Sequence, residues 1–321
     1  MPSGEVWARY EAEEPSLQAA YDVWLDRLLP QAEQFDRGAR VSGRIKSYRS
    51  VYGKLRRNPD SPRTWDSLGD LVAFKAIFPT PAGADQFTVW LSEQDQWHPV
   101  LDDKLCEPHE LKYRSKQFDL YSHDVTDSKG QPLKIEVQVR TSAVDAWYVV
   151  DHRFKYKTVV PPTEDMQRKL NRLIVLTELF DQEVGEVERK RREDPEFAKD
   201  RLYESLITTS ERLTKGQTST SRPEGLLETL LTVFVEDADS LPAQIEAFVN
   251  ETEADLIRIF SEHLNSSDEY VEEVDWIYHE PEAVLIAERA VRRPQQLLAA
   301  VEHSNYRAEV DPMVEAFEAL R

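Results

Sequence analysis

The chain has 321 residues, of which 40% are hydrophobic and 31% are charged, and its formal net charge at pH 7 is −20. This length suggests two domains with enough apolar material for a substantial core. Because the sequence has no run of about 18 apolar residues, we expect no membrane span. Because the acidic N-terminus has no apolar leader, we expect a cytoplasmic protein. A single cysteine, Cys106, excludes an internal disulfide and a zinc site made of several cysteines.

The first predicted elements are two helices separated by a basic segment. Apolar residues near a 3.6-residue spacing predict a helix over residues 5–36, and a second helix is predicted over 48–57. If the chain between them is extended, Arg44 and Lys46 point the same way. Ser47 is a good N-cap for the second helix because its hydroxyl can accept from a free backbone N–H group.

Strands and helices alternate from there to residue 214. Residues 70–78 are apolar at nearly every position, which is typical of a central strand, and a short helix is predicted over 82–94. Two further strands are predicted over 118–125 and 133–141, joined by a turn at residues 127–130. The remaining helices of this part are predicted over about 144–156, 164–192 and 195–214.

The last hundred residues differ from the rest in charge. Residues 221–321 carry 7 Lys and Arg against 23 Asp and Glu, whereas residues 41–160 carry 18 against 16. Phosphate-bearing ligands would favour the earlier segment, although an acidic surface can simply aid solubility. The polar segment 214–225, rich in Gly, Ser, Thr and Pro, is the linker candidate. We therefore predict an α+β fold, a mixed β-sheet flanked by helices, over 1–213, and an acidic all-helical module over 226–321.

The strand predicted over 133–141 carries the first candidate catalytic residue. Apolar residues alternate there with Lys134, Glu136, Gln138 and Arg140, so one face is apolar and the other holds a carboxylate, an amide and two cations. A carboxylate flanked by cations on a rigid strand can hold a metal ion and triphosphate oxygens together. The solvated outer face of an antiparallel strand would show the same alternation.

A basic cluster is predicted at the start of the helix over 48–57. Ser50 and Lys54 are four residues apart and share one face of that helix, close to Arg44 and Lys46. Helix N-termini attract anions because free N–H groups and the helix dipole both point outward. The alternative is an exposed basic helix with a capped start.

Asp70 and the segment around Tyr113 complete the candidate site. A carboxylate at the head of a buried strand is costly unless it is paired or binds a metal. Together with Glu136, Asp70 forms a pair of carboxylates suited to Mg²⁺ on a nucleoside triphosphate. Tyr113, followed by Arg114 and Ser115, suits base stacking beside phosphates, although an ordinary loop tyrosine would look the same.

Together these segments resemble the RelA/SpoT synthetase family, the alarmone synthetases that transfer pyrophosphate from ATP to the 3′-hydroxyl of GTP or GDP. The resemblance covers residues 40 to 160 and rests on five motifs in the family's order and spacing. These are RIKSYRSVYGK (44–54), DLVAFK (70–75), KYRS (112–115), EVQVRT (136–141) and the residues Trp147, His152, Tyr156 and Lys157. It implies a nucleotidyltransferase-like synthetase fold, Mg²⁺ as the cofactor, and a protein that could assemble as a homo-oligomer.

The resemblance also implies a role for each matching residue. Asp70 and Glu136 would hold Mg²⁺, and Glu136 would help to take the proton of the 3′-hydroxyl. ATP would be bound by Arg44, Lys46, Ser50, Lys54 and Lys75, with Arg44 and Lys75 on either side of the adenine. The acceptor would be bound by Tyr113, Arg114, Ser115, Gln138, Arg140, His152 and Lys157.

The sequence departs from the family pattern mostly on the acceptor side. Lys112 replaces a glycine and Gln117 a histidine, while on the ATP side Lys75 replaces an arginine. Strict alternation from Asp70 would also place Lys75 on the opposite face of its strand.

Three functions therefore stay open. The first is a guanosine tetra- or pentaphosphate synthetase. The second is a toxin-type pyrophosphokinase acting on the 3′ end of tRNA or on adenine nucleotides, inhibited by the acidic C-terminal module, which could instead bind a partner. The third is a non-catalytic nucleotide sensor.

Overall fold

The computed structural model describes residues 3–56, 64–65, 68–103, 116–155, 160–219, 221–234 and 240–321. The chain divides into two compact units, Met1–Glu188 and Arg189–Arg321. None of the helices in these described stretches combines the length and the apolar character needed to cross a membrane.

The first unit contains five strands, five α-helices and the 3-10 helix η2 among its described residues. In chain order they are α1 (Ser3–Phe35), β1 (Arg40–Ile45), α2 (Tyr48–Leu55), β2 (Val72–Phe78), α3 (Pro81–Ser92), the 3-10 helix η2 (Asp95–Trp97), β3 (Val100–Asp103), β4 (Lys116–Thr126), β5 (Pro132–Thr141), α4 (Ser142–Lys155) and α5 (Glu164–Glu193), whose last residues belong to the second unit.

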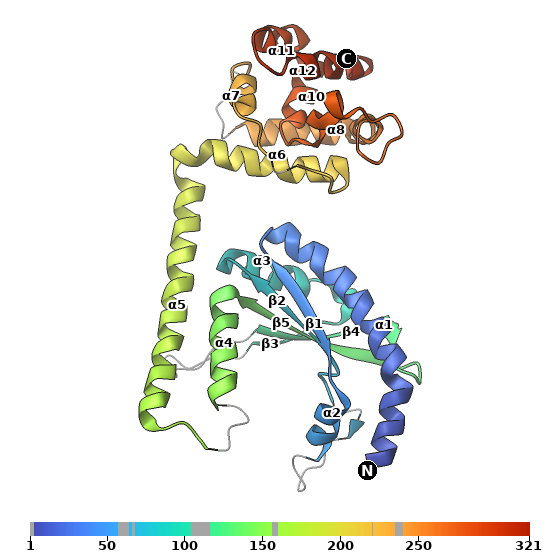
Figure 1. The fold of residues 1–321 in the computed structure, drawn as a ribbon, viewed down its shortest axis with the longest axis vertical. Helices are drawn as coiled ribbons and strands as arrows, with labels where there is room; N and C mark the ends of the chain where they lie inside the picture. The colour runs from blue at the N-terminus through green and yellow to red at the C-terminus, as the bar shows by residue number, and fades with distance from the viewer. Residues whose placement is uncertain are drawn as a thin grey trace. The chain divides into compact units, whose positions relative to one another are not determined.

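The strands form one mixed sheet in the order β1-β2-β5-β4-β3. The central pair β2 and β5 is parallel, and all other neighbours are antiparallel. Helices α1 and α3 cover one face of the sheet, and α4 lies against the other (Figure 1). This arrangement confirms the predicted α+β fold with a mixed sheet between helices.

The face toward α1 and α3 holds the apolar core of this unit. The Phe74 ring stacks on Tyr21 of α1 at 5.4 Å between centroids, and Phe78 packs against Phe87 of α3 at 5.2 Å. Gly43 of β1 lies opposite Phe74, and a Cβ there would come within 2.5 Å of that ring. Glycine at this position therefore allows the aromatic pair to lie directly over β1, and the polar side chains are left to the other face.

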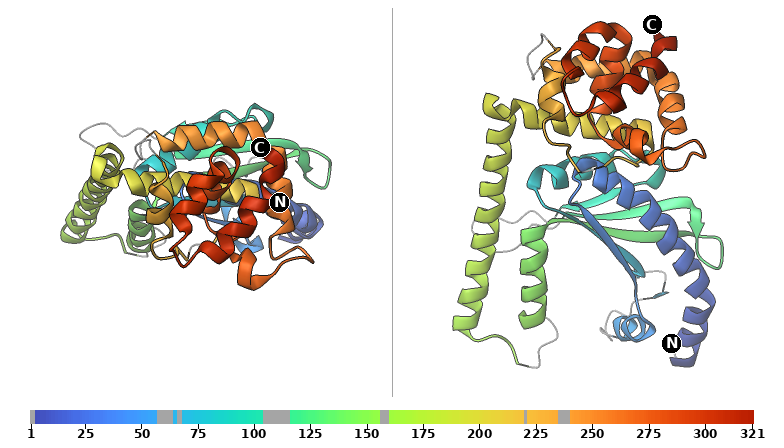
Figure 2. Two further views of the ribbon diagram at one scale, coloured as in Figure 1. Left: turned by 90° about the horizontal axis from the view of Figure 1, so that it is seen from above. Right: turned by 45° about the horizontal axis from the view of Figure 1, so that its top comes forward.

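Two edge strands, β1 and β3, are not predicted as complete strands by the sequence. Both are short, and β1 has an exposed or half-buried side chain at every position. The other elements lie close to their predicted positions. Strand β2 begins at Val72, so Asp70 precedes the regular strand. The helix α2 lies beside the start of α1, where Trp7 meets the Tyr48 ring edge-on at 4.8 Å (Figure 2).

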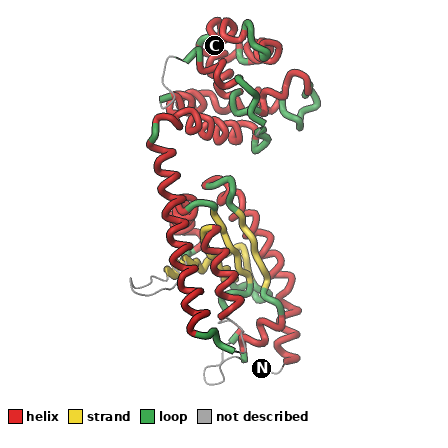
Figure 3. Tube along the Cα trace, turned by 60° about the vertical axis from the view of Figure 1, so that its left-hand side comes forward, coloured by secondary structure: helices red, strands yellow, loops and turns green. Residues whose placement is uncertain are grey.

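The described part of the second unit contains only helices and loops (Figure 3). They are η3 (Pro195–Phe197), α6 (Ala198–Thr214), α7 (Leu226–Leu231), α8 (Leu241–Glu262), α9 (Glu272–Asp275), η4 (Trp276–His279), α10 (Ala283–Arg292), α11 (Pro294–Val301), α12 (Arg307–Ala316) and η5 (Glu318–Leu320). Leu202, Leu206 and Leu213 of α6 belong to its buried core. This unit therefore begins earlier in the chain than the module expected over 226–321.

The segment expected to be a linker is bonded to the C-terminal helices. Ser219 donates its backbone N–H to the His279 carbonyl at 2.6 Å, and His279 Nδ1 lies 2.7 Å from the Gln217 carbonyl. The Ser221 hydroxyl donates to Glu280 Oε1 at 2.6 Å. The polar composition of this segment thus supplies hydrogen bonds within the second unit.

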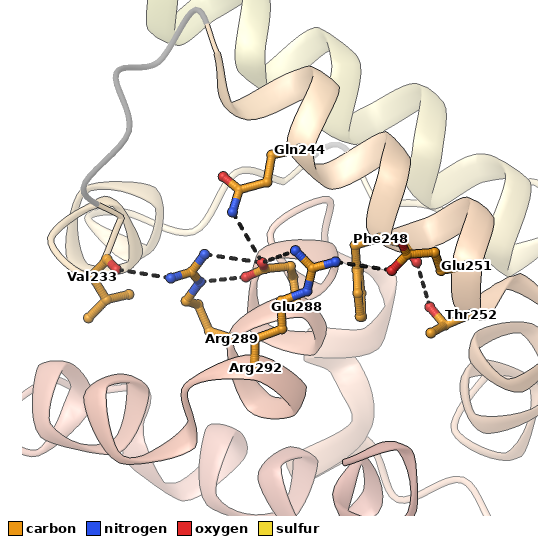
Figure 4. A network of polar contacts seen from close by, with 8 residues as sticks. All are labelled: Val233, Gln244, Phe248, Glu251, Thr252, Glu288, Arg289 and Arg292. Atoms are coloured by element: carbon orange, nitrogen blue, oxygen red, sulfur yellow. Dashed lines mark hydrogen bonds and ion pairs between the residues drawn. The ribbon is translucent and has the colours of Figure 1, made fainter.

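A buried ion network joins α10 to α8 (Figure 4). Glu288, whose side chain is fully buried, accepts a hydrogen bond from Arg289 Nη2 at 3.1 Å and lies 3.7 Å from Arg292 Nη1. Gln244 of α8 donates to the same carboxylate at 3.5 Å. Arg289, which is only 2% exposed, also reaches the Val233 carbonyl at 3.4 Å. The network gives each buried charge a partner.

Glu282 is a buried carboxylate without such partners. The residue is 0% exposed, and neither carboxylate oxygen has a hydrogen-bond partner. Burial, added to by the charges of Glu280 and Glu228 and only partly offset by the Glu282 backbone N–H group and by Arg222, raises the pKa of Glu282 from 4.5 to about 7. The folded protein therefore holds this proton at pH values where the unfolded chain has lost it.

We expect the second unit to lose stability as the pH rises from about 4.5 to about 7. The raised pKa belongs to the folded state. The contribution of the Glu282 carboxyl to the free energy of unfolding is therefore full below about pH 4.5 and about 3 kcal/mol smaller above pH 7. Glu282→Gln should remove this loss, so that hydrogen exchange of the α10 amides at pH 8 is slower than in the wild type and unchanged near pH 4.5. Glu302→Gln, at an exposed position, is the control. Equal exchange in Glu282→Gln and wild type at pH 8 would contradict the prediction.

Candidate functional site

The polar face of the sheet brings together side chains from four strands. Residues paired across neighbouring strands point to the same face. The registers pair Lys75 with Ser42 on one side and with Gln138 on the other, and they pair Glu136 with Asp119. Because Asp70 precedes the regular strand, the alternation that seemed to separate it from Lys75 does not apply.

Asp70 lies between two lysines at the edge of this face. Lys46 pairs with Asp70 Oδ2, and Lys54 Nζ lies 2.8 Å from Oδ1. Burial acts to raise the pKa of Asp70, but the hydrogen bonds from Lys46 and Lys54 outweigh it and hold that pKa below its ordinary value. Burial, aided by the charges of Lys54 and Arg44, lowers the pKa of Lys46 despite its bond to Asp70. The site thus gathers more positive charge than its carboxylate neutralises.

Helix α2 begins where the sequence predicts, with Ser47 as its N-cap. The Ser47 hydroxyl makes no capping bond to a backbone N–H group, and lies instead 3.0 Å from the Ser50 hydroxyl. The predicted capping position is therefore confirmed, whereas the predicted capping bond is not formed. Both hydroxyls remain at the start of the helix, one turn before Lys54.

Glu136 is oriented by two amides. Gln138 Nε2 donates to Glu136 Oε1 at 2.6 Å, and Gln117 Nε2 donates to Oε2 at 3.1 Å. Burial raises the pKa of Glu136, and the charges of Asp70 and Asp119 raise it further. Asp70 is thus near enough for its charge to act on Glu136.

Asp145 of α4 connects Lys75 to Arg140. Its Oδ1 lies 3.0 Å from Lys75 Nζ and 3.2 Å from Arg140 Nη1. Arg140 also donates to Gln138 Oε1, and its guanidinium lies 3.7 Å from the centre of the Tyr148 ring. Because Arg140 is only 2% exposed, it lies behind the surface and orients Gln138, which in turn holds Glu136.

A pocket of about 290 Å³ opens between β1, β2, β5 and α4. It is lined by Ser42, Gly43, Arg44, Ala73, Phe74, Lys75, Gln138, Tyr148, Val149 and His152. The structure thus brings together Arg44 and Lys75, the two residues predicted to enclose adenine. His152, predicted on the acceptor side, lines this same pocket beside the Tyr148 ring, 5.9 Å away.

The other predicted acceptor residues, Tyr113, Arg114, Ser115 and Lys157, lie outside the described residues. Sequence reasoning missed Asp119, Asp145 and Tyr148. The alternation in the strand over 118–125 could have indicated Asp119, because it is a polar residue between two buried ones. No sequence signal indicates Asp145 or Tyr148, since their roles depend on how α4 packs against the sheet.

Comparisons with known proteins show which family residues 43–160 resemble. The model of the region found in RelA / SpoT proteins matches residues 43–160. A relative, the GTP pyrophosphokinase YjbM of Bacillus subtilis (strain 168), is 24% identical over 149 residues, which are 46% of this chain and 70% of the relative.

One solved structure supports the same fold for the first part of the chain. The crystal structure of small alarmone synthetase 1 from Bacillus subtilis matches with a TM-score of 0.50 and 19% identity over 58% of this chain and 98% of that chain. Small alarmone synthetase 2 from the same organism has a TM-score of 0.45 and 16% identity over 54% and 95% of the two chains. Residues 43–160 of this chain are therefore a RelA/SpoT domain, with distant similarity to the small alarmone synthetases.

Proposed function

We propose that this protein is a pyrophosphokinase that transfers the β,γ-pyrophosphate of ATP to the 3′-hydroxyl of GTP or GDP. The observation that carries the proposal is that Glu136, held by two amides, lies within reach of the charge of Asp70, which two lysines hold. The RelA/SpoT domain and the similarity to a GTP pyrophosphokinase support the acceptor.

ATP would bind through two parts of this face. The pocket between Arg44 and Lys75 suits the adenine, because cationic side chains stack on aromatic rings. Lys46 and Lys54 would receive the phosphates. Both ammonium groups are already assembled around Asp70, so incoming phosphate oxygens would replace the carboxylate as their partner and release it for another role.

The released carboxylate fits a Mg²⁺ site. No group of three or more His, Cys, Asp and Glu side chains suited to a metal ion occurs among the described residues, but Mg²⁺ on nucleotides needs only one or two carboxylates in addition to phosphates and water. Asp70 and Glu136 would supply these ligands. The bound ion would offset the negative charge that develops on the bridging oxygens during transfer.

Glu136 would also accept the proton of the attacking 3′-hydroxyl. Burial raises its pKa, so its carboxylate is a stronger base than an exposed glutamate. The amides of Gln117 and Gln138 each occupy one carboxylate oxygen and fix its orientation, while Arg140 fixes Gln138 from behind.

Transfer of the γ-phosphate label tests this function. The full chain is incubated with γ-labelled ATP and Mg²⁺ and with GTP, GDP, ATP or bulk tRNA in turn. A labelled 3′-pyrophosphate on GTP or GDP supports the proposal. Labelled tRNA, or a new labelled adenine nucleotide larger than ATP when ATP is the sole nucleotide, supports the toxin-type alternative, and ATP binding without transfer supports a sensor.

Lys75→Arg should strengthen ATP binding. A planar guanidinium stacks on adenine better than an ammonium group, and an arginine can keep the ion pair with Asp145. We expect the Kd for ATP to fall by about twofold to fivefold, the effect of roughly 0.5–1 kcal/mol for an exposed cation–π contact. The measurement is titration with ATP, with Lys129→Arg, on an exposed turn, as the control. Weaker binding of ATP by Lys75→Arg would place adenine elsewhere.

A further inference from the structure

Lys134 is a cation of this face that the proposed function has not used. It begins the polar alternation of β5, two residues before Glu136, and forms an ion pair with Asp119 of β4. Asp119 in turn lies opposite Glu136 in the antiparallel register. This ion pair holds the Lys134 ammonium group in a fixed direction.

The direction is set by a glycine next to Asp70. A Cβ on Gly69 would lie 2.5 Å from Lys134 Cε and 2.7 Å from Nζ, so the Lys134 side chain crosses the Gly69 backbone at van der Waals contact. On the other side of the same segment, Lys46 donates its backbone N–H to the Leu71 carbonyl at 2.8 Å. Lys46 and Lys134 therefore flank the segment that leads into β2 from its two sides.

From this geometry we infer that Lys134 is a further phosphate-binding residue of the site, and that Asp119 is the positioning residue that aims it across Gly69. The inference rests on the proposed function for the identity of the ligand, a nucleotide phosphate. The phosphate belongs either to ATP or to the acceptor, whose hydroxyl must approach Glu136. Separate titrations with ATP and GDP distinguish these two sources.

Lys134→Gln should weaken the binding of one nucleotide about tenfold or more, the range for losing one charged hydrogen bond. A larger Kd for GDP with unchanged ATP binding assigns the acceptor phosphates, and the reverse assigns those of ATP. Guanosine, which has no phosphate, should bind the variant and the wild type equally. Lys129→Gln removes the same charge from the exposed turn of the β4–β5 hairpin and should leave both Kd values unchanged.

Gly69→Ala provides the sharper test, because it displaces Lys134 without removing its charge. The new methyl group meets only the flexible end of that side chain, so the protein should fold normally. We expect Gly69→Ala to bind the nucleotide that Lys134→Gln binds weakly, ATP or GDP, severalfold more weakly than the wild type does. In the Lys134→Gln background the added alanine should have no further effect, because two changes that act through one contact are not additive.

The outcomes separate this inference from the proposed function. If the wild type transfers label but Lys134→Gln binds ATP and GDP as tightly as the wild type, the role of Lys134 is overturned and the function stands. If Gly69→Ala weakens binding equally with and without Lys134, the glycine acts on Asp70 and the positioning argument is overturned. Failure of the wild type to bind any nucleotide overturns both. Lys134→Gln leaves the Asp119 carboxylate without its lysine partner, which could disturb folding. The Asp119→Asn/Lys134→Gln double variant removes that carboxylate as well. It should weaken nucleotide binding as much as Lys134→Gln does if misfolding is not the cause of the weaker binding.

Discussion

Glu136→Gln is expected to bind ATP nearly as well as the wild type and to lose pyrophosphate transfer. The glutamine has nearly the same shape: its oxygen can accept from the Gln138 amide, and its new NH2 group can donate to Gln117 once that side-chain amide turns over. It cannot take a proton and is a poor ligand for Mg²⁺. Loss of general-base catalysis alone lowers a rate by about 10² to 10⁴. The measurement is the initial rate of label transfer to GTP at saturating ATP, with the ATP Kd determined on the same sample.

Two controls make this result specific. Glu93→Gln changes an exposed carboxylate after α3 and should leave the rate unchanged. Gln138→Glu places a second carboxylate beside Glu136 and removes the amide that Arg140 orients, so it should also be slow although Glu136 is intact. A turnover near that of the wild type in Glu136→Gln would remove this residue from the mechanism.

The positions of the residues proposed to bind ATP could be predicted from the sequence because these residues lie on regular local structure. Arg44 and Lys46 follow a strand alternation, and Ser50 and Lys54 follow a helical one, so short motifs fix which face each side chain takes. In the structure Lys46 and Lys54 meet Asp70, and Arg44 lines the same pocket as Lys75. The register of β2 against β5 was not predictable, and it is this register that puts Lys75 beside Gln138.

Contacts that depend on packing between distant elements could not be read from the sequence. His152 shares a helix motif with the predicted acceptor residues, yet the way α4 lies on the sheet turns it toward Arg44 and Lys75. Residues 195–214 have the same amphipathic pattern whichever unit they pack against. Only the structure shows that Leu202, Leu206 and Leu213 join the core of the second unit. The polar segment 214–225 has the composition of a linker, and the composition does not indicate that the segment is hydrogen-bonded to Glu280 and His279.

Glu288→Ala is expected to destabilise the second unit strongly. It would leave Arg289, which is 2% exposed, with the Val233 carbonyl at 3.4 Å as its remaining hydrogen-bond partner in Figure 4. Removing one partner of a buried ion pair costs about 3–5 kcal/mol because the other charge stays buried and uncompensated. The expected result is a lower urea midpoint for the unfolding of this unit, measured through the hydrogen exchange of the α10 amides. Glu246→Ala, at an exposed position on α8, is the control.

A double variant separates the uncompensated charge from the loss of packing. In Glu288→Leu/Arg289→Met both charges are replaced by apolar side chains of similar volume, and such replacements are often neutral or stabilising. This variant should therefore be more stable than Glu288→Ala, although it contains two changes in the core. If Glu288→Ala were as stable as the control, the network in Figure 4 would contribute nothing to stability. If the double variant were less stable than Glu288→Ala, the network would owe its contribution to shape rather than to the pairing of its charges.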